Sequence, residues 1–104
     1  MQTFPKTRIE ILIEAPLKAR LAALLDAHGV SGYTIFSAKG GKGADGAWSR
    51  TGQIAEIGHM LLFVCILDKD KREGLLGALQ DTLAPHIGYV LASDAEVIRP
   101  SKFP

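Results

Sequence analysis

The chain has 104 residues, of which 47% are hydrophobic and 22% are charged. This length corresponds to one domain, which is large enough to fold without stabilisation by a metal or a disulfide. Twelve Lys and Arg residues oppose eleven Asp and Glu residues, for a formal net charge of +1. That balance gives no support to a broad nucleic-acid surface, which needs a basic excess, so we expect no nucleic-acid partner.

Cysteine content and hydrophobic run length restrict the class of protein further. The single cysteine, Cys65, excludes an intramolecular disulfide and any multi-cysteine zinc site. The longest apolar run, Met60 to Leu67, is far shorter than the roughly 20 residues that a membrane-spanning helix needs. The first residues lead into a strand-like pattern without a signal peptide. We therefore expect a cytoplasmic domain.

The first part of the chain predicts a strand, a helix and a second strand. Residues 8–14 alternate between isoleucines and mostly polar residues, as in a half-buried strand. Leucines at helical spacing predict a helix from about Pro16 to His28, with proline in its first turn and Gly29 after its end. Residues 30–37 are rich in β-branched and aromatic side chains, which favours a second strand.

The segment from Ala38 to Gly58 differs in character from its surroundings. It holds six glycines together with Lys39, Lys42 and Arg50. Because glycine loses the most conformational freedom on ordering, this composition predicts a long mobile loop. Loops of such length in a compact domain tend to be functional or disordered.

The last part of the chain predicts a strand, a helix and two further short strands. Residues 60–67 are apolar on both sides, residues 68–85 carry a leucine stripe that ends at a proline, and residues 88–92 and 96–99 have strand character. Three acidic residues near the start of the helix fit helix capping: Asp68, Asp70 and Glu73.

This order of elements predicts an α+β fold, the ferredoxin-like βαββαβ arrangement with a long loop between strands 2 and 3. Two helices cover only one face of such a sheet. A strand that is apolar on both sides then suggests that another copy of the chain covers the open face. The alternative is that a few exposed apolar side chains are tolerated, as on most proteins.

No catalytic or metal-binding constellation is evident in the sequence. The histidines, His28, His59 and His86, are not at metal-ligand spacing, and no serine lies in a G-x-S-x-G elbow. Cys65 lies within a predicted buried strand, where thiols are usually inert. We therefore expect a binding or regulatory protein without a catalytic residue or a metal site, and not an enzyme.

Several residues fit ligand or partner binding, each with an ordinary alternative. The run from Lys39 to Gly43 offers backbone N–H groups and positive charge to a phosphate, but it has no P-loop spacing and is otherwise a solvated hairpin. Trp48, with Arg50 beside it, is either a partner anchor or loosely packed. Arg99 and Lys102 either close over a bound anion or belong to a solvated tail.

The chain resembles the PII signal-transduction superfamily over nearly its whole length. The resemblance lies in the element order, the Gly29–Thr34 segment, the Lys39–Gly40 pair and the closing 96–99 segment. It implies one PII-like domain over residues 1–104 and a homotrimer that binds adenine nucleotides in clefts between subunits. It also implies a partner-binding T-loop over about residues 38–58, a B-loop and a C-terminal C-loop.

The resemblance carries nucleotide-binding roles onto particular residues. Thr34 matches the threonine near the adenine, Gly40 and its neighbour Gly41 match the base of the T-loop, Gly88 lies at the end of the B-loop, and Arg99 matches a C-loop arginine. The resulting nucleotide set is Thr34, Lys39, Gly40, Gly41, Gly88, Arg99 and Lys102. The T-loop would present Trp48 and Arg50 to a partner.

Departures from the family pattern refine the expected ligand. The lysine-rich B-loop is absent, with His86 as the polar candidate there, and Ser101 replaces a second C-loop arginine. We therefore expect AMP, ADP or a cyclic nucleotide to bind better than ATP. The T-loop has no tyrosine, so a uridylylation switch is not available.

Within the superfamily, the chain is most similar to the carboxysome-associated PII-like proteins. This implies bicarbonate as a second ligand and a bicarbonate transporter as a plausible target. The alternatives are a trimeric ferredoxin-like metal-tolerance protein and a small enzyme acting on a nucleotide.

Overall fold

A computed structural model describes residues 1–43, 46–49 and 59–102 of the chain. The strands are β1 (Phe4–Glu14), β2 (Thr34–Ala38), β3 (Gly40–Gly43), β4 (Gly46–Ser49), β5 (Met60–Leu67) and β6 (Gly88–Val97). The helices are α1 (Lys18–Ala27) and α2 (Arg72–Leu83), each preceded by a short 3-10 turn. No helix in these ranges is long and apolar enough to cross a membrane.

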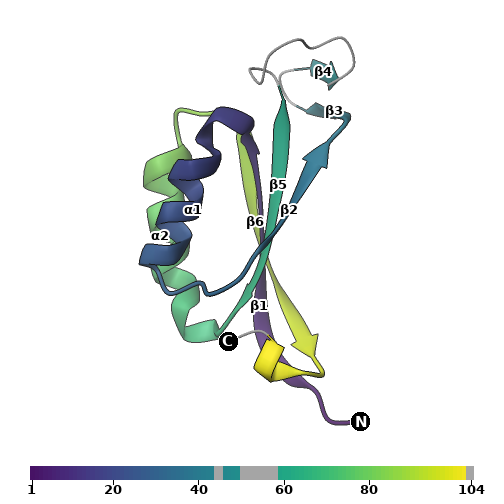
Figure 1. The fold of residues 1–104 in the computed structure, drawn as a ribbon, viewed down its shortest axis with the longest axis vertical. Coiled ribbons are helices and arrows are strands. Elements are labelled where there is room, and N and C mark those ends of the chain that lie inside the picture. The colour runs from purple at the N-terminus through teal and green to yellow at the C-terminus, as the bar shows by residue number, and fades with distance from the viewer. Residues whose placement is uncertain (44–45, 50–58, 103–104) are drawn as a thin grey trace.

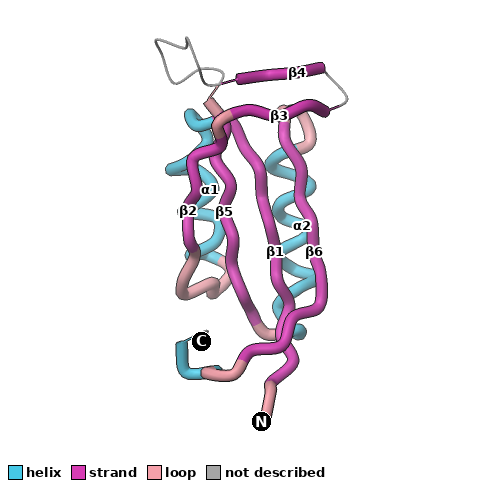
Figure 2. The backbone as a smooth tube through the Cα atoms, turned by 90° about the vertical axis from the view of Figure 1, so that its right-hand side faces the viewer, coloured by secondary structure: helices cyan, strands magenta, loops and turns pink. Residues whose placement is uncertain are grey.

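Four strands form one antiparallel sheet in the order β2-β5-β1-β6. Both helices pack on the same face of this sheet, as Figure 1 shows, and Figure 2 looks onto the opposite face, with the helices behind the strands. The predicted α+β, ferredoxin-like βαββαβ fold is thus confirmed.

The core lies between the helices and the sheet, where the alternation of β1 directs Ile9, Ile11 and Ile13 inward with at most 1% exposure. Facing side chains come from β5 and from the leucine stripes of both helices. The fully buried members of this set are Phe63, Leu67, Leu21, Leu25, Leu75 and Leu79. Burial of each such side chain contributes roughly 1.5–3 kcal/mol, so this layer is the main source of stability.

Several element boundaries differ from the sequence prediction. The two expected strands at 88–92 and 96–99 are one continuous strand, because β6 pairs with β1 from Gly88 opposite Ile13 to Val97 opposite Phe4. The second strand begins at Thr34 instead of Val30. Val30 is buried in the core, and the Tyr33 ring packs on Phe63 with ring centroids 5.3 Å apart.

The end of α1 follows the prediction at Gly29. This glycine has φ of +75°, its N–H donates to the Asp26 carbonyl at 3.1 Å, and the Val30 N–H donates to the Leu25 carbonyl at 3.0 Å. These are the two bonds of a Schellman helix end, which favours glycine. The Lys71 ammonium also donates to the Gly29 carbonyl at 3.1 Å.

The segment predicted as a loop contains regular structure in its first part. β3 and β4 pair from Gly40 opposite Ser49 to Gly43 opposite Gly46, so the expectation of a long loop is wrong for residues 40–43 and 46–49. Glycine and lysine fill β3, and main-chain hydrogen bonds make such a ladder without any apolar face. Residues 50–58 lie outside the described part of the chain.

The predicted capping role of Asp68 is wrong. Asp68 precedes the 3-10 turn Lys69–Lys71 but makes no capping hydrogen bond. Its carboxylate instead accepts a hydrogen bond from the Lys6 ammonium on β1. Asp70 and Glu73 do lie in the first turns of their helical segments.

This pairing predicts a small acid-dependent loss of stability. The hydrogen bond from Lys6 and its positive charge hold the pKa of Asp68 below its usual value. A lowered folded-state pKa stabilises the fold at pH values above the unfolded-state pKa of about 3.9, and this stabilisation is lost as the pH falls through the folded-state pKa. The melting-temperature advantage of the unsubstituted protein over Asp68→Asn should therefore shrink below about pH 4.

Thermal unfolding between neutral and acidic pH measures this difference. Asp81→Asn, on the exposed surface of α2, is the control for loss of one carboxylate. An advantage over Asp68→Asn that stays constant on acidification would show that the pair with Lys6 does not form in solution.

Candidate functional site

A cleft of about 450 Å³ opens beside the start of β2, and we call it the Thr34 cleft. Val64 and Ile66 of β5 form an apolar part of its wall. Residues 31–33, which precede β2, form a second part of the wall. The C-terminal end of β6 and the following turn close it with Val97 and Lys102. The structure therefore brings Thr34 and Lys102 to one cleft, and their role in nucleotide binding stays a prediction.

Two charged residues of β1 lie beside this cleft. Arg8 lines it directly, and its Nε and Nη2 donate to Glu10 Oε1 at 3.1 and 2.7 Å. Sequence reasoning missed Arg8. The sequence feature that pointed to Arg8 was its position on the polar side of an alternating strand. That pattern alone does not show what the side chain faces.

A second cleft, of about 280 Å³, lies beside Gly88 and we call it the Gly88 cleft. The end of α2, the connection with His86, and Leu12 and Ile13 of β1 line it. Gly88 has φ of +135°, and a Cβ built there would lie 1.9 Å from the Leu12 carbonyl oxygen. Only glycine fits this close approach of two backbones.

The two clefts lie at opposite ends of β6. Gly88 is the first residue of this ten-residue strand and Val97 is the last. At about 3.3 Å per residue, these two residues are roughly 30 Å apart along the strand. Arg99 and Lys102 follow Val97, at the end of the molecule that is yellow in Figure 1. Within one chain, Gly88 therefore lies far from Arg99 and Lys102. Thr34 lies between the two ends, because it pairs with Val64, which lies opposite Glu10, and Glu10 lies opposite Leu91 of β6.

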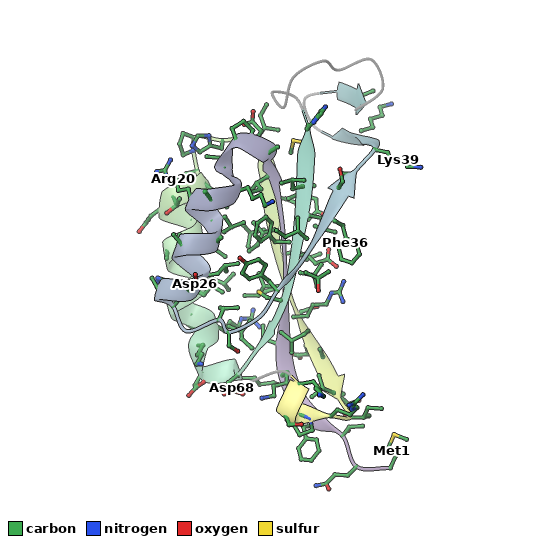
Figure 3. The ribbon with its side chains drawn as sticks, in the orientation of Figure 1. Met1, Arg20, Asp26, Phe36, Lys39 and Asp68 are labelled. Carbon is green, nitrogen blue, oxygen red and sulfur yellow. The ribbon has the colours of Figure 1, made fainter. Side chains whose placement is uncertain are left out.

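Lys39, Gly40 and Gly41 lie at the same end of the sheet as Gly88. Ala38 pairs with Met60, Met60 with Glu14, and the neighbouring Ile13 with Gly88. Figure 3 places Lys39 at this end, at the turn from β2 into β3. Lys39, Gly40, Gly41 and Gly88 thus lie at one end of the sheet, Arg99 and Lys102 follow the other end of β6, and Thr34 lies between them.

The predicted partner-binding residues are only partly described. The Trp48 backbone pairs with Gly41 in the β3–β4 ladder. Arg50 lies outside the described residues. Their role in partner binding stays a prediction.

Chemically reactive groups are sparse in this region. Cys65 is 2% exposed, and burial raises the pKa of its thiol to about 11, so the thiol is neutral and inaccessible near neutral pH. Among the described residues no group of three His, Cys, Asp or Glu side chains is arranged to hold a metal ion.

The sheet face opposite the helices carries large apolar side chains. Phe36, Tyr89 and Leu91 are 53%, 48% and 49% exposed, and Leu62, Val64 and Ile66 of β5 lie half-buried on the same face. Figure 3 shows Phe36 pointing away from the helices. Exposed apolar side chains gathered on one face are typical of interaction sites.

Comparisons with known proteins agree on one family. The family described as nitrogen regulatory protein P-II matches residues 6–102. CPII, a nitrogen regulatory PII-like protein from Thiomonas intermedia K12 solved with ADP, AMP and bicarbonate, superposes with a TM-score of 0.88. It is 30% identical over 98% of this chain and 96% of CPII.

Further structures extend this likeness. CPII bound to ADP and bicarbonate superposes with a TM-score of 0.83 at 30% identity over 99% of this chain and 98% of CPII. A proposed PII-like signaling protein from Thermus thermophilus has a TM-score of 0.83 over the full length of both chains, and its 23% identity supports the fold alone. No curated protein matches the chain.

Proposed function

Because the chain belongs to the nitrogen regulatory protein P-II family, we propose that it is a non-enzymatic regulatory protein that binds AMP or ADP in clefts between the subunits of a homotrimer. The observation that carries this proposal is the separation of Lys39, Gly40, Gly41 and Gly88, at one end of β6, from the Thr34 cleft, which Val97 and Lys102 close at its other end. A single chain holds two half-sites, and neither contains the whole candidate set.

A second copy would complete each half-site. The end with Lys39, Gly40, Gly41 and Gly88 of one copy would face the Thr34 cleft of the next. Such a contact joins two different surfaces, and repetition of it closes into a ring when the rotation permits. The apolar sheet face supports self-association, because burial against other copies would remove it from water.

The charges favour a nucleotide with few phosphates. Arg99 and Lys102 supply cations near the Thr34 cleft, and arginine suits phosphate by charge and fork geometry. Ser101 lies between them and carries no charge, and the other half-site offers mainly backbone N–H groups with Lys39. We therefore expect AMP or ADP to bind better than ATP.

We further propose that bicarbonate is a second ligand and that a bicarbonate transporter is a target. CPII has been solved with ADP and bicarbonate together, which motivates the first part. In this proposal ligand binding shifts the population of conformations of segment 38–58, which then presents Trp48 and Arg50 to the partner. A ligand shifts such a population only by its differential affinity for the two states.

Isothermal titration calorimetry with AMP, ADP and ATP, each with and without bicarbonate, tests the proposal. We expect ADP or AMP to bind best, bicarbonate to strengthen binding, and Arg99→Ala to weaken ADP binding roughly tenfold or more, the effect of one charge-assisted hydrogen bond. Arg20→Ala is the matched control, because Arg20 lies on α1, as Figure 3 shows, and lines neither cleft.

Each outcome of this titration decides one part of the proposal. Binding that is indifferent to bicarbonate would remove the second ligand and keep the nucleotide site. Turnover of the nucleotide during incubation would favour an enzyme. Absence of binding by all three nucleotides would overturn the proposed function.

A further inference from the structure

The Thr34 cleft contains a charged side chain that the proposed function leaves unused. Arg8 lines this cleft together with Thr34, Val64 and Lys102. Its side chain is 43% exposed in the single chain, and because it lines the cleft itself, a ligand bound there would meet it. Its backbone is held on both sides, because Arg8 pairs with Ile66 of β5 and with Ser93 of β6.

Glu10 holds the Arg8 side chain in place. Two guanidinium nitrogens of Arg8 donate to the same carboxylate oxygen, at 3.1 and 2.7 Å, and the Glu10 side chain is only 20% exposed. A guanidinium has five N–H donors, so others are left for a ligand. Arg8 is thus a fixed donor at the wall of the cleft.

The surroundings of Arg8 suit a neutral base better than a phosphate. The Glu10 carboxylate largely compensates the charge of Arg8, and it would repel a phosphate brought to the same place. Val64 and Ile66 provide apolar surface in the same cleft, on which a flat ring can pack. The second cation that lines this cleft is Lys102, whereas Glu96 brings a negative charge.

We propose that Arg8, positioned by Glu10, is a specificity-determining residue that donates hydrogen bonds to the purine of the bound nucleotide. The adenine ring nitrogens are acceptors, so one guanidinium N–H can donate to one of them, whereas the bidentate arginine contact belongs to guanine. This inference rests on the proposed function, since it assigns one residue to the base end of the same site. In this assignment Arg8 binds the base of the nucleotide, whereas Arg99 and Lys102 bind its phosphates.

Titrations with adenosine and with ADP test this assignment. Arg8→Met, which removes the donors and keeps a long side chain, should weaken adenosine and ADP by the same factor, roughly tenfold, as expected for the loss of a hydrogen bond from a charged donor. Arg99→Ala should weaken ADP and leave adenosine unchanged. Light scattering on each variant checks that its mass in solution equals that of the unsubstituted protein.

Arg8→Lys provides a second measurement if Arg8→Met does not assemble. Lysine keeps the charge next to Glu10 but lacks the planar fork, so this variant should also lose adenosine affinity. A variant that assembles and binds adenosine as the unsubstituted protein does would overturn the inference, and so would a loss confined to ADP. Failure of the unsubstituted protein to bind ADP would instead overturn the proposed function, and this inference with it.

Discussion

Gly88→Ala should destabilise the fold by on the order of 4 kcal/mol, within the range of the most damaging single substitutions. Alanine is strained at a φ of +135°, and its Cβ would lie 1.9 Å from the Leu12 carbonyl oxygen. The obstacle is backbone of the central strand β1, so it cannot turn aside as a flexible side chain does. Chemical denaturation monitored by circular dichroism measures the free energy of unfolding.

Gly77→Ala is the matched control for this substitution. Gly77 lies in α2, and nothing stands within 4 Å of a Cβ built there. Alanine in a helix interior is favoured over glycine by up to about 1 kcal/mol. The two variants should therefore change stability in opposite directions, and a Gly88→Ala protein as stable as the parent would show that β1 and β6 do not approach closely at this point.

Phe36→Glu should convert the proposed trimer into monomers. Phe36 is 53% exposed on the open sheet face, so the isolated chain can accommodate a carboxylate there. In an assembly that covers this face, the substitution removes roughly 2 kcal/mol of apolar burial at each contact. It also buries an unpaired charge, which costs still more. Size-exclusion chromatography with light scattering reads the mass directly.

Ala23→Glu, on the exposed surface of α1, is the control, and it should keep the mass of the parent. Circular dichroism should show that Phe36→Glu remains folded, which separates loss of assembly from loss of structure. A parent protein that is already monomeric, or a Phe36→Glu protein that keeps the parent's mass, would contradict the role given to the open face.

The strands and helices could be predicted where burial alone determines the pattern. Ile9, Ile11 and Ile13 are buried because they alternate, and Gly29 ends α1 because its backbone requires a positive φ. Prediction failed where a residue meets a distant partner. Tyr33 looked like part of a strand but packs on Phe63, and Asp68 looked like a helix cap but binds Lys6.

Individual residues of the candidate site could be predicted from the sequence, but their arrangement in space could not. The family resemblance selected Thr34 and Lys102, which the structure places in one cleft. It did not show that Gly88 lies at the other end of β6, because that separation depends on how β1 and β6 pair. Arg8 went unnoticed for the same kind of reason, since its importance comes from side chains that the fold places around it.

The pairing of Ala38 with Met60 has a consequence for the length of the chain between them. Because these residues are direct neighbours in the sheet, the intervening segment begins and ends at one point of the sheet. The strand register therefore does not depend on the length of this segment, and for a flexible insertion each doubling of length costs only about 0.6 kcal/mol in closure entropy. Insertions at this point, whether by evolution or to carry a reporter peptide, should leave the rest of the domain intact.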